Sequence, residues 1–354
     1  MMDKKGRISR IVTVGTLPVG GGFPVSVQSM TTPHTADVAA VIRQIRELEA
    51  AGCQLIRVTV PDEAAAATLA EIKKAMTVPL VADIHFNYRL ALRAIDAGAD
   101  KIRINPGNIG SSERVKTVLT AAQAAQVPIR IGVNSGSLEK EMLEKYGHPT
   151  AEAMVESAAR HIRICEDVGF EDIIVALKAS SVPLMIAANR LFAERFDYPL
   201  HLGVTEAGPP WQGTIKSAIG IGTLLAEGIG DTIRVSLTDD PVQEVRAGFE
   251  ILKSLEMVKK GVTIISCPTC GRAEVDIISI VKELETKVKS IQKPVTVAVM
   301  GCAVNGPGEA READLGVAGG KQNFLLFKKG TVVAKIPESQ VIERLLEEID
   351  KLAI

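Results

Sequence analysis

Short apolar runs alternate with longer amphipathic stretches from the start of the chain to about residue 257. The apolar runs have the length of β-strands, and each stretch between them is long enough to form a crossover helix. Such alternation predicts parallel strands that are joined by helices. The predicted strands span residues 24–30, 54–60, 79–85, 101–105, 128–134, 172–178, 199–206 and 231–237.

This strand count favours an α/β fold in which the strands close into a (β/α)8 barrel of the TIM type. An open doubly wound sheet is the alternative. The glycines in AGC, AGAD, VGFED and EGIGD supply the helix stops that either fold needs. Before the first strand, RIVTVGTLPVGGG predicts a small hairpin that closes the bottom of the barrel.

Beyond the barrel the pattern changes, which predicts two domains, a barrel over residues 1–258 and a smaller α+β domain over residues 262–354. In the second domain, VTIIS, PVTVAVM, NFLLFKKG and TVVAKI predict strands, whereas AEVDIISIVKELETKVKS and PESQVIERLLEEIDKL predict helices. A glycine- and proline-rich loop follows PVTVAVM.

Polar side chains occupy alternate positions near the carboxyl ends of the predicted barrel strands. Because side chains alternate between the two faces of a strand, Lys101, Arg103 and Asn105 of KIRIN face one way and the isoleucines face the other. An ordinary barrel fills its interior with Val, Ile and Leu, so a cationic interior would be unusual. The predicted substrate-binding residues are Arg57, Asp83, His85, Arg103, Asn105, Arg130, Asn134, Lys178, His201, Arg234 and Ser236.

The excess of cations in this lining indicates an anionic ligand. Burying an unpaired guanidinium group is costly, and Asp83 and Glu206 are too few carboxylates to neutralise the arginines. A structural network of salt bridges is the alternative. Since the planar guanidinium group binds phosphate oxygens in bidentate fashion, a diphosphate or another multiply charged small molecule is the expected substrate class.

Composition excludes several classes of function. Hydrophobic residues make up 46% and charged residues 23% of the chain, and the formal net charge is -1, which excludes a disordered chain and offers no general basic surface for nucleic acid. Aromatic residues are only 3%, so few rings could stack on bases. No stretch resembles a signal peptide or a membrane span, so we expect a cytoplasmic protein that does not enter a membrane.

The cysteines predict a metal site in the second domain. An odd number, five, argues against a framework of disulfides. SCPTCGR carries Cys267 and Cys270, and MGCAVNGPGEA carries Cys302 in an open loop, where thiolates suit zinc or an iron–sulfur cluster. No histidine follows His201 to complete a zinc site, and Glu309 is the nearest anionic side chain. This set favours a 4Fe-4S cluster, with zinc and unliganded thiols as the alternatives.

These cysteine motifs, with VADIHFN, KIRINPGN, IRIGVNSGSL and GVTEAG in the barrel, resemble the bacterial 4-hydroxy-3-methylbut-2-enyl diphosphate synthases over nearly the whole chain. The resemblance implies an iron–sulfur oxidoreductase of the non-mevalonate isoprenoid pathway, which reductively opens and dehydrates 2-C-methyl-D-erythritol 2,4-cyclodiphosphate. It further implies that Cys267, Cys270, Cys302 and Glu309 hold the cluster, that the polar barrel lining binds the diphosphate, and that reduced flavodoxin or ferredoxin supplies electrons.

Two further expectations concern proton delivery and an alternative function. We expect Glu206, on the loop after the seventh strand, to deliver a proton near the reacting carbon, because partial desolvation there would raise its pKa. The competing function is a non-redox, phosphate-binding barrel transferase with a zinc-stapled C-terminal module.

The direction of the last barrel helix predicts a head-to-tail homodimer. A helix over residues 240–257 runs antiparallel to the strands and carries the chain roughly 27 Å away from the barrel mouth. Because the VKKG linker is short, the cluster of one chain is expected to serve the barrel mouth of its partner. A monomer with a bent linker is the alternative.

Overall fold

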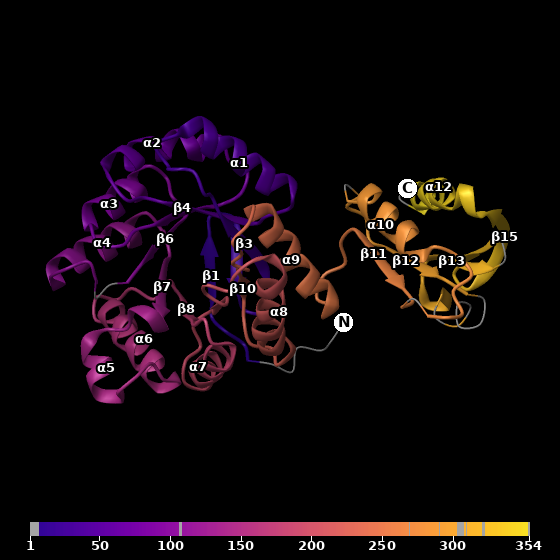
Figure 1. The fold of residues 1–354 in the computed structure, drawn as a ribbon. Coiled ribbons are helices and arrows are strands. Elements are labelled where there is room, and N and C mark those ends of the chain that lie inside the picture. The colour runs from indigo at the N-terminus through magenta and orange to yellow at the C-terminus, as the bar shows by residue number, and fades with distance from the viewer. Residues whose placement is uncertain are drawn as a thin grey trace. The chain divides into compact units, whose positions relative to one another are not determined.

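The computed structural model describes residues 7–105, 108–268, 270–289, 291–302, 308, 310–320 and 323–352. The chain forms two compact units, Met1–Met257 and Val258–Ile354, which are considered separately below. The first is a barrel of parallel strands surrounded by helices, and the second is a smaller α+β unit (Figure 1). The expected fold class is confirmed.

The barrel sheet has the strand order β8-β7-β6-β5-β4-β3-β10-β9, and all of its pairs are parallel. A parallel bridge between Val175 and Leu200 joins the two ends of this order and closes the barrel. The last two strands are shorter than expected. The strands are β3 (Ser26–Met30), β4 (Leu55–Thr59), β5 (Leu80–Asp83), β6 (Lys101–Ile104), β7 (Ile129–Asn134), β8 (Ile173–Lys178), β9 (His201–Leu202) and β10 (Thr232–Ile233).

Helices follow the strands and cover the outside of the barrel (Figure 1). Several begin at a side chain that accepts a hydrogen bond from the first turn, such as Asp37 at α1, Asp62 at α2 and Thr150 at α6. The helices are α1 (Val38–Ala50), α2 (Glu63–Lys74), α3 (Tyr88–Asp96), α4 (Ser112–Ala124), α5 (Lys140–Tyr146), α6 (Ala151–Glu166), α7 (Val182–Arg195), α8 (Pro210–Ala226) and α9 (Pro241–Ser254).

The expected hairpin closes the bottom of the barrel. Strands β1 (Ile11–Val14) and β2 (Leu17–Gly20) pair in antiparallel fashion. Their buried valines pack against the first inward-facing residues of three barrel strands, which makes an apolar layer below the polar interior. This layer consists of Val12, Val14, Val19, Leu55, Val81 and Ile174.

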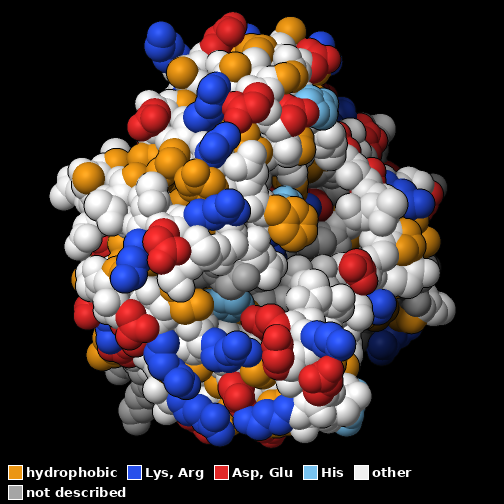
Figure 2. All heavy atoms as spheres, turned by 90° about the vertical axis from the view of Figure 1, so that its left-hand side faces the viewer, with side chains coloured by type: hydrophobic (Ala, Val, Ile, Leu, Met, Phe, Trp, Pro, Cys, Tyr) orange, Lys and Arg blue, Asp and Glu red, His pale blue; other side chains and the backbone are white. Residues whose placement is uncertain are grey.

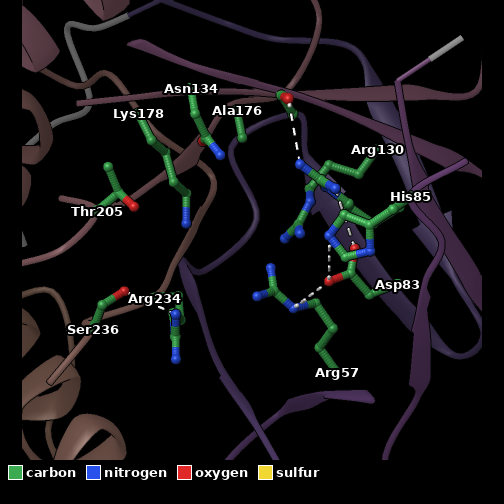
Figure 3. Close-up of a pocket in the computed structure, with 12 residues that line it drawn as sticks. Arg57, Asp83, His85, Arg130, Asn134, Ala176, Lys178, Thr205, Arg234 and Ser236 are labelled. Carbon is green, nitrogen blue, oxygen red and sulfur yellow. Dashed lines mark hydrogen bonds and ion pairs between the residues drawn. The ribbon is translucent and has the colours of Figure 1, made fainter. Parts of the chain in front are cut away.

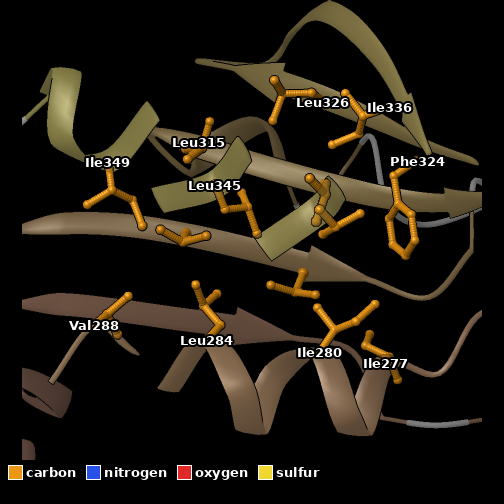
Figure 4. Packing of buried hydrophobic residues seen from close by; sticks show 14 of the residues in the cluster. Ile277, Ile280, Leu284, Val288, Leu315, Phe324, Leu326, Ile336, Leu345 and Ile349 are labelled. Atoms are coloured by element: carbon orange, nitrogen blue, oxygen red, sulfur yellow. The ribbon is translucent and has the colours of Figure 1, made fainter. Parts of the chain in front are cut away.

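The second unit is a five-stranded sheet in the order β11-β12-β13-β14-β15, in which β12 pairs in parallel with β11 and β13, and β14 pairs in antiparallel fashion with β13 and β15. Helices α10 and α12 pack on one apolar core of this sheet (Figure 4). Strand β13 was not predicted, because DLGVAGG is rich in glycine. The elements are β11 (Val262–Ser266), α10 (Ile277–Lys287), β12 (Val295–Met300), β13 (Leu315–Gly320), β14 (Asn323–Lys328), β15 (Thr331–Pro337) and α12 (Val341–Leu352).

The surface of the barrel mixes charges of both signs. On the face shown in Figure 2, Lys and Arg side chains are interspersed with Asp and Glu, and the blue side chains form no extended single-sign area there. That face therefore lacks the basic stripe typical of nucleic-acid binding. Among the described residues, no helix combines the length and the apolar character needed to cross a membrane.

Candidate functional site

A polar cavity of about 140 Å³ lies inside the barrel at the carboxyl ends of its strands. Its labelled side chains point into a common space from different strands (Figure 3). All of the predicted substrate-binding residues except Asn105 and His201 line it, and Thr205 is a further polar residue that the prediction did not select. The lining is Arg57, Asp83, His85, Arg103, Arg130, Gly132, Asn134, Ala176, Lys178, Thr205, Arg234 and Ser236.

Asp83 is the carboxylate in the cavity wall, and it is shared by three cationic or titratable side chains. Its oxygens lie 3.7 Å from Arg57 Nε, 3.4 Å from Arg103 Nη1 and 4.0 Å from His85 Nε2. Burial would raise the pKa of Asp83, but these neighbours outweigh it and hold the pKa below its ordinary value. Asp83 is therefore an anion that can neutralise only part of the surrounding positive charge.

Arg130 crosses the barrel interior, and almost nothing there neutralises its positive charge. It is 2% exposed, and its Nη1 donates to Gln28 Oε1 at 3.4 Å, from β7 to β3 on the opposite side of the barrel. Neither Arg130 nor Lys178 has an ion-pair partner among the described residues. Burial, followed by the neighbouring arginines, lowers the pKa of both groups well below the ordinary values. A bound anion would offset the free-energy cost of burying these two positive charges.

Arg234 is held by a carboxylate that the sequence analysis missed. Glu244, in the first turn of α9, accepts from Arg234 Nε at 3.2 Å and from Nη2 at 3.0 Å. Arg234 Nη1 donates to Ser236 Oγ at 2.9 Å. A sequence signal was present, because Glu244 is a charged residue within the otherwise apolar buried stripe of an amphipathic helix.

Two glycines make room for the cavity cations. A Cβ on Gly132 would lie 3.0 Å from Arg103 Nε, and one on Gly203 would lie 2.9 Å from Lys178 Nζ. A Cβ at position 132 would therefore press on the Arg103 guanidinium group, and one at position 203 would clash first with the carbonyl oxygen of Arg234 at 2.6 Å. Asn105 supports the same region from behind, since its Oδ1 accepts from Gly132 N at 2.9 Å.

Two other predicted residues lie outside the cavity wall. His201 is fully buried, and neither of its ring nitrogens has a hydrogen-bond partner among the described residues. Glu206 is exposed, which differs from the partial desolvation that we expected for it. Its backbone has a φ of 52°, in the left-handed region that is unfavourable for a residue with a side chain. Such strain is common in loops at functional sites.

The loop after β7 is anchored beside the mouth. Glu139 Oε1 lies 2.8 Å from His161 Nε2 and accepts from Ser157 Oγ at 3.0 Å. Although burial would raise the pKa of Glu139, these contacts lower it to about 2. The anchor holds the segment that follows Asn134, a residue of the cavity wall.

The predicted metal ligands lie at one edge of the second unit. Cys267 directly follows β11, and Cys302 follows the adjacent parallel strand β12 after Gly301, whose N–H donates to Cys267 Sγ at 3.2 Å. Cys270 is exposed between β11 and α10. Glu309 lies outside the described residues, and within the described ranges no three His, Cys, Asp or Glu side chains are arranged as a metal site.

The chemistry of these three cysteines differs from that of the other two. Cys267, Cys270 and Cys302 are free and at least partly accessible, whereas Cys53 and Cys165 are buried in the barrel. Desolvation raises the pKa of each buried thiol to about 12, which opposes the thiolate form that metals bind. The donor set and the backbone N–H directed at Cys267 therefore fit a thiolate-bound metal group in the second unit.

Comparisons with known proteins match each of the two units to a known domain. A family described as the GcpE TIM-barrel domain matches residues 9–249, and one described as the GcpE protein C-terminal domain matches residues 263–351. A 4-hydroxy-3-methylbut-2-en-1-yl diphosphate synthase (flavodoxin) from Geobacillus thermodenitrificans is 59% identical over 345 residues, which are 98% of this chain and 92% of the relative. The Geobacter sulfurreducens protein of the same name is 56% identical over 344 residues, 97% and 98% of the two chains. The resemblance stated from the sequence is confirmed.

Among solved structures, the likeness concerns the fold alone. The dihydropteroate synthase of Yersinia pestis superposes with a TM-score of 0.51 and 15% sequence identity, covering 70% of this chain and 98% of that one. The sialic acid synthetase of Leptospira borgpetersenii gives a TM-score of 0.50 at 14% identity, covering 79% and 97%. These matches agree with a barrel fold and carry no functional argument at such identity.

Proposed function

The chain belongs to the GcpE family, and we propose that it catalyses the reductive ring opening and dehydration of 2-C-methyl-D-erythritol 2,4-cyclodiphosphate to 4-hydroxy-3-methylbut-2-enyl diphosphate. One observation of the structure supports this most strongly. The cavity gathers Arg57, Arg103, Arg130, Lys178 and Arg234, and one carboxylate lies in its wall. A cyclic diphosphate supplies the negative charge that this arrangement lacks.

In this proposal the side chains of the cavity bind different parts of the ligand. Arg130 and Lys178 have no ion-pair partner in the described part of the chain and can take phosphate oxygens, while Arg234 is oriented for the same purpose by Glu244. Ser236 and Asn134 add neutral hydrogen bonds at the mouth. Charge-assisted contacts of this kind are each worth roughly 1.5 to 3 kcal/mol, so several are enough to orient the ligand.

The remaining predicted residues act around this core. Asp83 and His85 lie at the wall beside two arginines, and Asn105 acts through Gly132. We retain Glu206 as the residue that delivers a proton. Its position after β9, on the carboxyl side of the barrel, supports this role, and a ligand and a covering surface would supply the desolvation that its exposed side chain lacks.

We further propose that the second unit holds a 4Fe-4S cluster on Cys267, Cys270 and Cys302, with Glu309 as the fourth ligand. The free thiols at the edge formed by β11 and β12 support this assignment. When bound, such a cluster supplies electrons one at a time and Lewis acidity. Gly301 N–H then stabilises the thiolate of Cys267, to which it already donates.

The electron donor and the assembly complete the proposal. The names of the relatives favour reduced flavodoxin over ferredoxin as the donor. A head-to-tail homodimer, in which the cluster of one chain serves the partner's barrel, remains supported by the chain direction, since α9 begins at the carboxyl side of the strands and ends at Ser254 close to the unit boundary. We also propose a cytoplasmic location, in keeping with cysteines that are all free.

Anaerobic purification tests the function directly. We expect a brown protein that absorbs near roughly 400 nm, contains iron and sulfide, and converts the cyclic diphosphate when reduced flavodoxin is supplied. A colourless, zinc-containing protein without this turnover would contradict the proposal and favour the non-redox transferase. Mixing an inactive Cys302→Ser chain with an inactive Arg130→Ala chain tests the dimer, because exchange should restore part of the activity. Confirmed exchange without recovery would exclude the head-to-tail arrangement.

A further inference from the structure

The barrel interior contains a layer of polar side chains between the cavity and the apolar bottom. Lys101, His201 and Thr232 are fully buried, and Ser26 and Gln28 are 1% exposed. The parallel register places Thr232 beside both His201 and Ser26, on three neighbouring strands. None of the five lines the cavity. We call these five residues the sub-cavity layer.

Apart from Gln28 Oε1, which accepts from Arg130, the side-chain polar atoms of this layer have no hydrogen-bond partner within the described part of the chain. Among the described residues, no hydrogen-bond partner is found for Lys101 Nζ, for either ring nitrogen of His201, for Gln28 Nε2 or for the hydroxyls of Ser26 and Thr232. Buried polar groups nearly always have a partner, so these unpaired donors and acceptors are unusual for a folded interior.

The charged neighbours that act on Lys101 and His201 among the described residues are cations. Arg57 and Arg130 act on Lys101, and these two arginines with Lys178 and Lys101 act on His201. Asp83 is engaged by Arg57 and Arg103 at the cavity wall, and Glu244 is engaged by Arg234. Burial, and then the neighbouring cations, lower the pKa of Lys101 and of His201 well below their ordinary values.

We propose that Lys101 and His201 are proton acceptors coupled to the anion site, uncharged in the empty enzyme and protonated when a polyanion fills the cavity above them. The ligand's negative charge offsets the arginines that oppose protonation, so a proton from solvent becomes stable on Lys101 Nζ or on a His201 ring nitrogen. This inference rests on the proposed function only for the anionic nature of the ligand. In this proposal both residues are positioning residues, because they change the charge beneath the anion site and do not contact the ligand.

The coupling has a definite sign. Because the complex binds more protons than the free enzyme, affinity for the anion must increase as the pH falls. The increase is at most about tenfold per pH unit for one proton, and it ends below the lowered pKa of the free enzyme. If binding is not accompanied by proton uptake, affinity stays constant over this pH range.

Calorimetric titration measures the proton directly. The protein is titrated with the cyclic diphosphate, and separately with sulfate, in two buffers of low and high ionisation enthalpy at one pH near neutrality. Neither ligand has an oxygen that titrates there, so a heat difference between the buffers counts protons bound by the protein. We expect uptake of roughly one proton per bound ligand.

Two variants assign the proton to the layer. Lys101→Met and His201→Asn should each reduce the uptake and flatten the pH dependence of affinity, while Lys116→Met and His148→Asn, at exposed positions, should leave both unchanged. Thermal unfolding checks that each variant is folded, and Lys101→Gln replaces Lys101→Met if the latter is not.

The outcomes separate this inference from the proposed function. Binding of either anion without proton uptake, or uptake that is the same in the folded Lys101 and His201 variants as in wild type, would overturn the inference. If sulfate binds with the expected uptake but the cyclic diphosphate does not bind, the coupling stands and the proposed substrate is wrong.

Discussion

Glu244→Gln should destabilise the barrel by removing the charge that compensates Arg234. Glu244 is 2% exposed and accepts hydrogen bonds from two nitrogens of Arg234, from Ser29 Oγ at 2.8 Å and from Leu237 N at 3.0 Å. Glutamine keeps the shape and one acceptor, but its amide NH2 must then face a donor. The buried guanidinium group therefore loses one contact and its counter-charge.

The magnitude follows from these contacts. Breaking a buried ion pair by removing one partner costs about 3 to 5 kcal/mol, and a charge-assisted hydrogen bond is worth roughly 1.5 to 3 kcal/mol. Since glutamine preserves one acceptor, we expect a loss of about 1.5 to 3 kcal/mol, which lowers the Tm of a unit of this size by roughly 3 to 12 °C. Sulfate should recover part of this loss, because an anion in the cavity replaces the missing partner of Arg234.

Thermal unfolding with and without sulfate measures both effects. The control is Glu250→Gln on the same helix, where the side chain is 67% exposed and its ion-pair partner among the described residues is Lys253. We expect this control to behave as wild type. If Glu244→Gln and Glu250→Gln unfold at the same temperature, or if sulfate stabilises both equally, Arg234 does not depend on Glu244 and the reasoning is refuted.

Three other changes test the site and its surroundings. Gly132→Ala should weaken binding of the cyclic diphosphate in calorimetry, because the new Cβ lies 3.0 Å from Arg103 Nε, whereas Gly136→Ala meets open space and should bind normally; equal affinities would contradict this. Cys302→Ser should abolish the cluster absorbance and turnover while the barrel keeps its circular dichroism, and near-normal turnover would remove the cluster from the mechanism. The stability difference between wild type and Glu139→Gln in urea unfolding should be full above pH 4.5 and vanish as the pH falls towards 2, because the folded pKa is lowered to about 2; a difference independent of pH would exclude the anchor.

Strand periodicity predicted the cavity wall because a side chain on a strand can face only two ways. Arg57, Asp83, Arg103, Arg130 and Lys178 each occupy the position of their own strand that was predicted to face the interior, and all of them line the cavity. The alternation does not show, however, how far along the barrel axis a side chain lies. That position depends on the offset between neighbouring strands, which the sequence pattern of one strand does not reveal.

His201 illustrates this limit. Its parity is that of Thr205, and both face the barrel interior, but β9 pairs with β10 and β3 so that His201 lies level with Thr232 and Ser26, below the cavity. Lys101 has the same relation to Arg103 within β6. The residues nearest the amino ends of these strands thus form the sub-cavity layer, and those further along the strands form the anion site.

The strand pattern could not predict the role of Glu244, because Glu244 lies in a helix. The prediction considered carboxylates in strands and loops, and therefore named Asp83 and Glu206 as the groups that could balance the cations. In the structure, Glu244 has the role that was expected of Glu206. The cations still outnumber their carboxylate partners, since Glu244 pairs with Arg234 and no described carboxylate pairs with Arg130 or Lys178.

A barrel with a cationic interior must obtain its stability elsewhere, and the structure shows where. The strand residues of the other parity, such as Ile102, Ile104, Ile129 and Ile131, are fully buried against the helices. The hairpin adds an apolar layer at the bottom, where Leu55 begins β4 below Arg57. Apolar burial on these two surfaces favours folding, while the desolvated cations oppose it. A bound polyanion removes that opposition, so ligand should stabilise this barrel more than the same number of contacts would in a barrel with a neutral interior.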